Sequence, residues 1–245
     1  MQVLVHDYET TGVNSRRCGV VQSAIWIAEF AEDGSYEVLA QEVAMHNPGR
    51  PIPSGASEVH GIYTHDVEHL PLFTDSLAET MKDAFESFSP VAVMGYNNTG
   101  FDNVIAYRFG LPETGLENID VFPAIKKLKA QGVLENAKLV TAYSTLTGDT
   151  DTDAAHDAEF DLYMTCALVP HLMRILNKPT FSELVTHLNT RVVDVDMPMP
   201  FGKHEGIELS EVPKSYRRWL LKDPSKLDPD LRASLEAIKR SEEEG

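Results

Sequence analysis

Two carboxylates stand close together where the first predicted strand ends. Asp7 and Glu9 follow a short apolar run at residues 2–5. Residues i and i+2 of a β-strand point to the same face, so these two side chains lie side by side. Like charges that close repel each other unless a cation lies between them, and an all-oxygen ligand set suits Mg²⁺ or Mn²⁺. The pair therefore indicates a site for a hard divalent cation, with two solvated acids on an edge strand as the alternative.

Two further groups of residues have chemistry that fits such a site. Asp102 follows a polar, glycine-containing loop and precedes a predicted helix, where a carboxylate can also be an ordinary N-cap. His156 lies where another predicted helix begins, and Asp161 lies about one turn inside it. The pKa of an unperturbed histidine is near neutral, so His156 is a candidate general base. Taken alone, it is better explained as a surface histidine in an acidic loop.

The three groups, in this order and local context, resemble the catalytic motifs of the DEDDh 3′–5′ exonucleases. The matching residues are Asp7, Glu9, Asp102, His156 and Asp161. The resemblance covers residues 1 to about 180, and residues 51–62 are similar to a loop that the family carries between its first two motifs. One departure is the pair Asn97-Asn98, where the family often has His-Asn. This departure leaves the substrate preference open.

The resemblance implies a two-metal mechanism with two divalent cations, Mg²⁺ or Mn²⁺. Asp7 would bridge both ions, Glu9 and Asp161 would complete the site of the attacking water, and Asp102 would serve the second ion. His156 would accept the proton of that water. The residues expected to contact the terminal nucleotide are Thr10, Thr11, Gly12, Asn98 and Phe101.

Short strands followed by alternating strands and helices must position these side chains. Apolar runs at residues 2–5, 20–30 and 36–40, with a Gly-containing turn at 32–34, predict a three-stranded antiparallel meander. Residues 90–95 predict a buried strand, and helices are predicted at 75–88, 103–109, 123–130 and 155–176. This order indicates an α/β domain with a mixed central sheet flanked by helices. By resemblance, it is the RNase H-like exonuclease fold.

The composition changes near a proline-rich hinge at residues 197–201. Residues 197–240 hold nine Lys or Arg and seven Asp or Glu, whereas residues 1–196 hold 12 and 28. We therefore expect an exonuclease domain at 1–180, a connecting segment at 181–196, a small basic and aromatic module at 197–240, and an acidic tail at 241–245. The module resembles the C-terminal segment of exonuclease X-type enzymes. Its candidate nucleic-acid contacts are Lys203, Arg217, Arg218 and Lys222, and the alternative is that its aromatic residues only form a small core.

Length and composition restrict the class of protein. The chain has 245 residues and a net charge of −17, without an apolar run long enough to span a membrane. It has two cysteines, which excludes a disulfide scaffold and favours a reducing compartment. We expect a cytoplasmic protein without a membrane association. The acidic balance is unusual for a nucleic-acid binder, unless carboxylates serve as metal ligands or the positive charge is local.

The function predicted from these observations is 3′–5′ hydrolysis of DNA to nucleoside 5′-monophosphates, in repair, degradation or replication. Single-stranded or overhanging 3′ ends are the expected partners, because an acidic surface repels long duplexes. The alternative substrate is RNA, either at 3′ ends or as short oligoribonucleotides. The C-terminal module could instead bind a second copy of the chain, to give a homodimer, or a protein partner. A non-catalytic scaffold with the same fold is also compatible with the composition.

Overall fold

The computed structural model describes residues 1–73, 83, 87–111, 115–190, 193–222 and 227–244. The chain forms two compact units, Met1–Asn189 and Thr190–Gly245, here called unit 1 and unit 2. The helix predicted at 75–88 lies largely outside the described residues.

Unit 1 is built on a mixed sheet, which in the described residues has five strands in the order β3-β2-β1-β4-β5. β1 pairs with β2, and β2 with β3, in antiparallel fashion, while β1–β4 and β4–β5 are parallel. The meander and the mixed sheet predicted from the sequence are therefore confirmed. The strands are β1 (Gln2–Thr10), β2 (Val20–Phe30), β3 (Tyr36–Met45), β4 (Ala92–Gly95) and β5 (Glu117–Asp120).

Helices cover both faces of this sheet. Those predicted at 103–109, 123–130 and 155–176 correspond to α4, α5 and α7. In the described part of the chain, no helix is both long and apolar enough to cross a bilayer. The helices of unit 1 are α1 (Ser54–His60), α2 (Thr64–Val67), α4 (Asp102–Arg108), α5 (Phe122–Ala130), α6 (Leu139–Thr147), α7 (Ala158–Ile175) and α8 (Phe181–Asn189).

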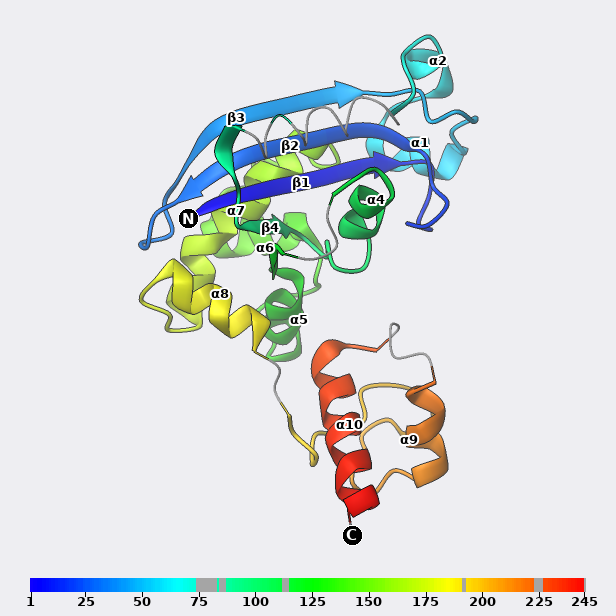
Figure 1. Cartoon of the computed structure of the whole chain (residues 1–245), viewed down its shortest axis with the longest axis vertical. Helices are drawn as coiled ribbons and strands as arrows, with labels where there is room; N and C mark the ends of the chain where they lie inside the picture. The colour runs from blue at the N-terminus through cyan, green and yellow to red at the C-terminus, as the bar shows by residue number, and fades with distance from the viewer. Residues whose placement is uncertain (74–82, 84–86, 112–114, 191–192, 223–226, 245) are drawn as a thin grey trace. The chain divides into compact units, whose positions relative to one another are not determined.

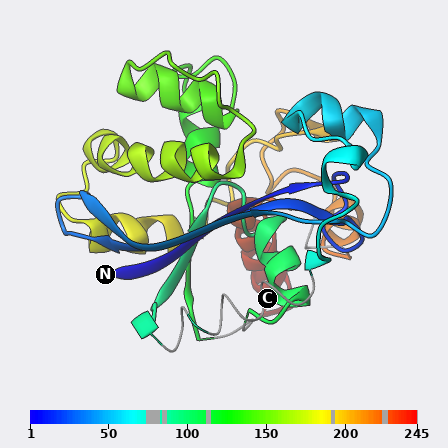
Figure 2. The same ribbon diagram turned by 90° about the horizontal axis from the view of Figure 1, so that it is seen from above.

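The alternation of side chains along β1 decides which face of the sheet carries the candidate site. Val3 and Val5 are fully buried in the core that includes residues of α7, whereas Leu4 is buried in the core that includes residues of α4. Figures 1 and 2 show α7 and α4 on opposite faces of the sheet. Asp7 and Glu9 continue the face of Val3 and Val5, so their side chains lie on the α7 side.

Helix α8 occupies a segment that we expected to be a connection between domains. Residues 181, 184, 185 and 188 are apolar and buried at helical spacing, which gives the helix a face that packs on unit 1. The ring of Phe181 stacks on Phe30 with centroids 4.6 Å apart, and its backbone N–H donates to the carbonyl of Glu32. Unit 1 therefore extends to Asn189, past the expected domain end at residue 180.

Unit 2 has a hydrophobic core of its own. It contains the 3₁₀ turn η1 (Gly202–His204), α9 (Lys214–Leu220) and α10 (Pro229–Glu244). The fully or nearly fully buried core residues are Met199, Leu209, Val212, Leu220, Leu231, Leu235 and Ile238. Aliphatic residues, and not the aromatic residues of the module, thus form its centre.

Candidate active site

The end of β1 extends beyond its neighbour β4. The last β1–β4 pair is Val5 with Met94, while on the other side Asp7 still pairs with Ala24 and Glu9 with Gln22. The two carboxylates therefore lie on the α7 face of the sheet, at the edge where β4 has already ended. An irregularity in the pairing follows directly, between Glu9 and Thr10.

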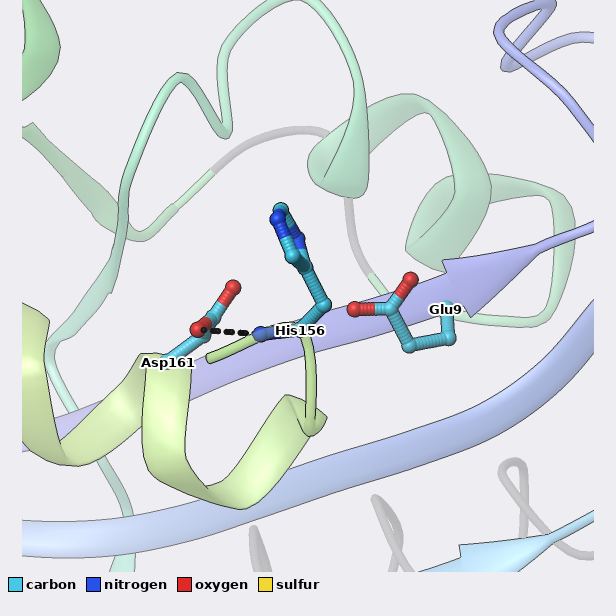
Figure 3. A group of neighbouring side chains, drawn as sticks. All are labelled: Glu9, His156 and Asp161. Atoms are coloured by element: carbon cyan, nitrogen blue, oxygen red, sulfur yellow. Dashed lines mark hydrogen bonds between the residues drawn. The ribbon is translucent and has the colours of Figure 1, made fainter. Parts of the chain in front are cut away.

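The first turn of α7 brings His156 and Asp161 to the same place. One potential ligand atom from each of Glu9, His156 and Asp161 lies within 4.8 Å of the others. Figure 3 shows the three side chains close to one another, with Glu9 on β1 and His156 and Asp161 at the beginning of α7. His156 precedes the helix with a left-handed φ of 69°, and its backbone N–H donates to Asp161 Oδ1 at 3.3 Å. The turn thus places these two predicted residues next to each other.

Asp102 comes to this group from the helix α4. It is the first residue of α4 and only 4% exposed. Its charge acts on Asp7, which is also affected by the charges of Asp161 and Glu9. The structure therefore brings the four predicted carboxylates and His156 into one group, from β1, α4 and the beginning of α7.

Burial and mutual repulsion make these carboxyl groups hard to ionise. Burial, followed by the charges of Asp102, Asp161 and Glu9, raises the pKa of Asp7 well above its ordinary value. Burial and the charges of neighbouring aspartates raise the pKa of Glu9 to about 8. Burial is also the main cause that raises the pKa of Asp102 to about 8 and that of Asp161 to about 6.

This donor set fits hard divalent cations. It consists of four carboxyl groups, and oxygen ligands are those that Mg²⁺ and Mn²⁺ prefer. The repulsion that raises their pKa values is removed when positive charge is placed between them. A bound cation would therefore hold these carboxylates ionised near neutral pH.

Gln22 and Asp157 hold the turn before α7, and sequence analysis missed both. Gln22 is 4% exposed; its Nε2 donates to Asp157 Oδ2 at 2.7 Å, and its Oε1 accepts from the backbone N–H of Ala158 at 3.2 Å. Asp157 also caps the helix by accepting from the backbone N–H groups of Glu159 and Phe160. These bonds fix the residues that directly follow His156. A polar residue in the apolar run of β2 was the available signal.

Asp120, also missed, organises the loop between β4 and α4. Its carboxylate accepts hydrogen bonds from the backbone N–H groups of Asn97, Thr99 and Phe122 at 2.9, 3.3 and 3.1 Å. Its charge contributes to the raised pKa of Asp102. Asp120 therefore positions the segment that leads to Asp102. Its only sequence signal was an acid at the end of a four-residue strand that was itself not predicted.

A buried polar network joins β1 to α4 on the opposite face of the sheet. His6 Nε2 lies 2.8 Å from Asn103 Oδ1, and Nδ1 lies 3.1 Å from the hydroxyl of Tyr8. Burial lowers the pKa of His6 to about 4, so the ring is neutral at pH 7. Because Asn103 Oδ1 only accepts, Nε2 carries the proton and Nδ1 accepts from Tyr8. Asn103 Nδ2 in turn donates to Asn118 Oδ1 at 2.7 Å. This network holds the residue after Asp102 against β1.

The predicted substrate contacts have different surroundings. Thr10 and Thr11 are each 8% exposed, and their hydroxyls bond to the backbone of Gly12 and Gly19 within the turn after β1. Phe101 is partly buried and directly precedes Asp102.

Asn98 departs from the prediction, because its side chain is 0% exposed. Its Nδ2 donates to Asn118 Oδ1 at 3.1 Å, and its Oδ1 is buried without a hydrogen-bond partner. Asn98 therefore supports its loop from inside and does not reach a substrate surface.

The predicted contacts in unit 2 also divide into two kinds. Lys203, Arg218 and Lys222 are exposed. Arg217 is 8% exposed, donates to the carbonyls of Leu209, Ser210 and Val212, and forms an ion pair with Glu242. The prediction that Arg217 contacts phosphate is therefore wrong, because its guanidinium is committed to carbonyls inside the unit.

Comparisons with known proteins support the fold. No protein-family model matches the sequence, and no curated protein matches it. Among solved structures, Escherichia coli exonuclease I with bound zinc ion and single-stranded DNA matches with a TM-score of 0.61 and 19% identity, over 76% of this chain and 43% of that one. Exonuclease X in complex with 5′ overhanging duplex DNA matches with a TM-score of 0.52 and 20% identity, over 75% of this chain and 98% of that one.

These matches confirm the expected α/β fold, which this chain shares with exonuclease I and exonuclease X. The matched region spans less than half of exonuclease I but nearly all of the solved exonuclease X chain.

Proposed function

We propose that this chain is a metal-dependent 3′–5′ exonuclease that acts on DNA. The observation that carries the proposal is the group of Asp7, Glu9, Asp102, His156 and Asp161 at the end of β1, with carboxyl pKa values raised by burial and repulsion. Its support comes from the exonuclease fold and from the order of these residues in the sequence. The neighbours described as complexes carry single-stranded DNA and 5′ overhanging duplex DNA.

The four carboxylates would hold two divalent cations, Mg²⁺ or Mn²⁺. Such ions, when bound, lower the pKa of water and stabilise charge on phosphate oxygens. His156 is exposed and lies beside Glu9 and Asp161, where its ring would accept the proton of the attacking water. The water oxygen bonds to phosphorus, and the bond from phosphorus to the 3′ oxygen of the preceding nucleotide breaks. That oxygen takes a proton from solvent, and a nucleoside 5′-monophosphate is released.

An oligonucleotide panel tests this reaction. The panel comprises 5′-labelled single-stranded, blunt and 3′-overhanging DNA and a matched RNA, each with Mg²⁺ or Mn²⁺. We expect products shortened one nucleotide at a time from the 3′ end of DNA, fastest for single-stranded ends. Internal cleavage, or no hydrolysis with either metal, contradicts the proposal. Faster turnover of the RNA reassigns the substrate and leaves the chemistry in place.

His156→Ala tests the role of the histidine. A general base contributes about 10²–10⁴-fold, so kcat should fall by that factor while a 3′ end still binds. His65→Ala is the matched control, because the His65 side chain is 76% exposed and lies on α2, outside the group. Equal activity of the two variants would show that another group accepts the proton.

A further inference from the structure

One face of α9 in unit 2 exposes a tryptophan between two cations. Ser215, Arg218, Trp219 and Lys222 follow each other at the spacing of one helical face, and all four are exposed. Trp219 is 58% exposed, while the core of the unit is complete without it. Because the core does not use it, the ring of Trp219 is available on the surface for stacking with a ligand.

The 3₁₀ turn η1 packs on Tyr216, the aromatic residue of α9 that lies beside this tryptophan. The ring of Tyr216 lies 5.4 Å from that of Trp219 with an interplanar angle of 34°, and Lys203 Nζ lies 5.2 Å from the centre of the Tyr216 ring. Gly202, with a φ of 79°, permits this approach, because a Cβ there would lie 2.8 Å from the Tyr216 hydroxyl. Lys203, Tyr216, Arg218, Trp219 and Lys222 are called the aromatic-basic face below.

The charge of this face selects the class of ligand. Residues 197–240 hold nine Lys or Arg and seven Asp or Glu, whereas residues 1–196 hold 12 and 28. Over the whole of unit 2, residues 190–245, the counts are ten and 12, so a polyanion is attracted only locally, at the exposed cations Lys203, Arg218 and Lys222. Exposed aromatic rings between cations suit a strand whose bases are unpaired, because each base stacks on a ring while its phosphates meet the cations.

We propose that the aromatic-basic face binds single-stranded nucleic acid, with a base stacked on Trp219 and phosphates at Arg218, Lys222 and Lys203. The binding adds a strand contact to the proposed exonuclease and does not depend on hydrolysis. The face therefore binds DNA in the absence of any divalent cation.

Intrinsic fluorescence of the full chain tests the proposal directly. The chain has two tryptophans, and Trp26 is 6% exposed inside unit 1, so a quencher in solution reaches Trp219 selectively. The metal is removed with EDTA, and a single-stranded oligonucleotide of about ten nucleotides is titrated. We expect saturable quenching of the tryptophan emission. In parallel, anisotropy of a labelled oligonucleotide gives Kd for variants that lack the tryptophan.

Substitutions distinguish the contribution of base stacking to affinity from that of charge. Base stacking of about 1–3 kcal/mol corresponds to a loss of about 5–150-fold in affinity for Trp219→Ala, with Trp219→Phe restoring most of it. Replacing Arg218 and Lys222 by Gln should lower the salt slope of binding by about 1.4, or about 0.7 for each lost phosphate contact on a single strand. Arg240→Gln, an exposed arginine on α10, is the matched control.

Three results would overturn the proposal. These are unchanged affinity of Trp219→Ala, absence of quenching on binding, and a loss of salt slope of about 0.7 in Arg240→Gln, the same per charge as in the double variant, which would indicate diffuse charge only. A fall in solution mass of Trp219→Ala, with unchanged DNA affinity, would assign the face to a second copy of the chain. Because binding is measured without metal, its failure and the failure of hydrolysis are distinguishable.

Discussion

Replacing Glu9 by glutamine should stabilise the metal-free protein at neutral pH. The folded chain raises the pKa of Glu9 from 4.5 to about 8, so the folded state holds the proton more tightly than the unfolded state. The free energy of unfolding therefore falls as pH rises from about 4.5 to about 8. A pKa difference of 1 is worth about 1.4 kcal/mol, so at pH 7 the cost is at most about 3 kcal/mol. The repulsion is shared with neighbouring carboxyls, so we expect Glu9→Gln to recover about 1–3 kcal/mol.

Thermal unfolding in EDTA at pH 5, 7 and 8.5 measures this effect. At about 2–4 °C per kcal/mol, the variant should unfold about 2–12 °C above the parent at pH 7, and the difference should shrink at pH 5. With Mn²⁺ the order should reverse, because the variant has lost a ligand. Glu37→Gln is the control, since Glu37 is exposed on β3 and its replacement should change stability by less than about 0.5 kcal/mol. A pH-independent difference, or equal stabilisation of parent and variant by Mn²⁺, would refute the reasoning.

Three further predictions concern residues that act through others. Gln22→Leu removes both buried bonds to the turn before α7, so kcat should fall about tenfold with KM nearly unchanged, as steady-state kinetics would show. Asp120→Ala leaves three backbone N–H groups without their acceptor and should lower the free energy of unfolding in urea by about 2–3 kcal/mol. Arg217→Met leaves the carbonyls of Leu209, Ser210 and Val212 without their donor, while Glu242 keeps its ion pair with Lys214. It should destabilise unit 2 by about 2–3 kcal/mol, measured by following Trp219 fluorescence during unfolding in urea. Arg218→Met, beside it, should cost less than about 0.5 kcal/mol.

The sequence was sufficient to predict those elements that are determined by a local pattern of residues. Strand alternation in β1 placed Asp7 and Glu9 on one face, and the order of the short motifs predicted which distant residues would meet them. Helix α8 was missed because its apolar spacing, at Phe181 and Leu184 among others, was interpreted as part of a connection. Strand β5 has four residues, too few for an alternating pattern to stand out.

The residues that position the site could not be predicted for a different reason. Gln22 and Asp157 are 135 positions apart in the sequence and meet only because α7 packs on β2. Asp120 positions its loop by accepting hydrogen bonds from backbone N–H groups. Almost every residue type has such a group, so the sequence contains no side-chain pattern that identifies its partners. Catalytic side chains can be predicted from their residue type and spacing. Side chains that position a loop can be identified only from their hydrogen-bond partners in the folded structure.

Composition alone suggests that Arg217 and Arg218 have the same role in unit 2, whereas helical periodicity distinguishes them. Neighbours on a helix point about 100° apart, so two adjacent arginines at the border of the buried face can have different surroundings. Residues 217 and 220 lie on the buried side of α9, and residues 215, 218, 219 and 222 lie on the exposed side. The unit therefore buries an arginine among carbonyls and exposes a tryptophan, the reverse of what their polarity favours. Because the two sides are distinct, the stability of the unit and its surface chemistry can be changed separately, at Arg217 and at Arg218.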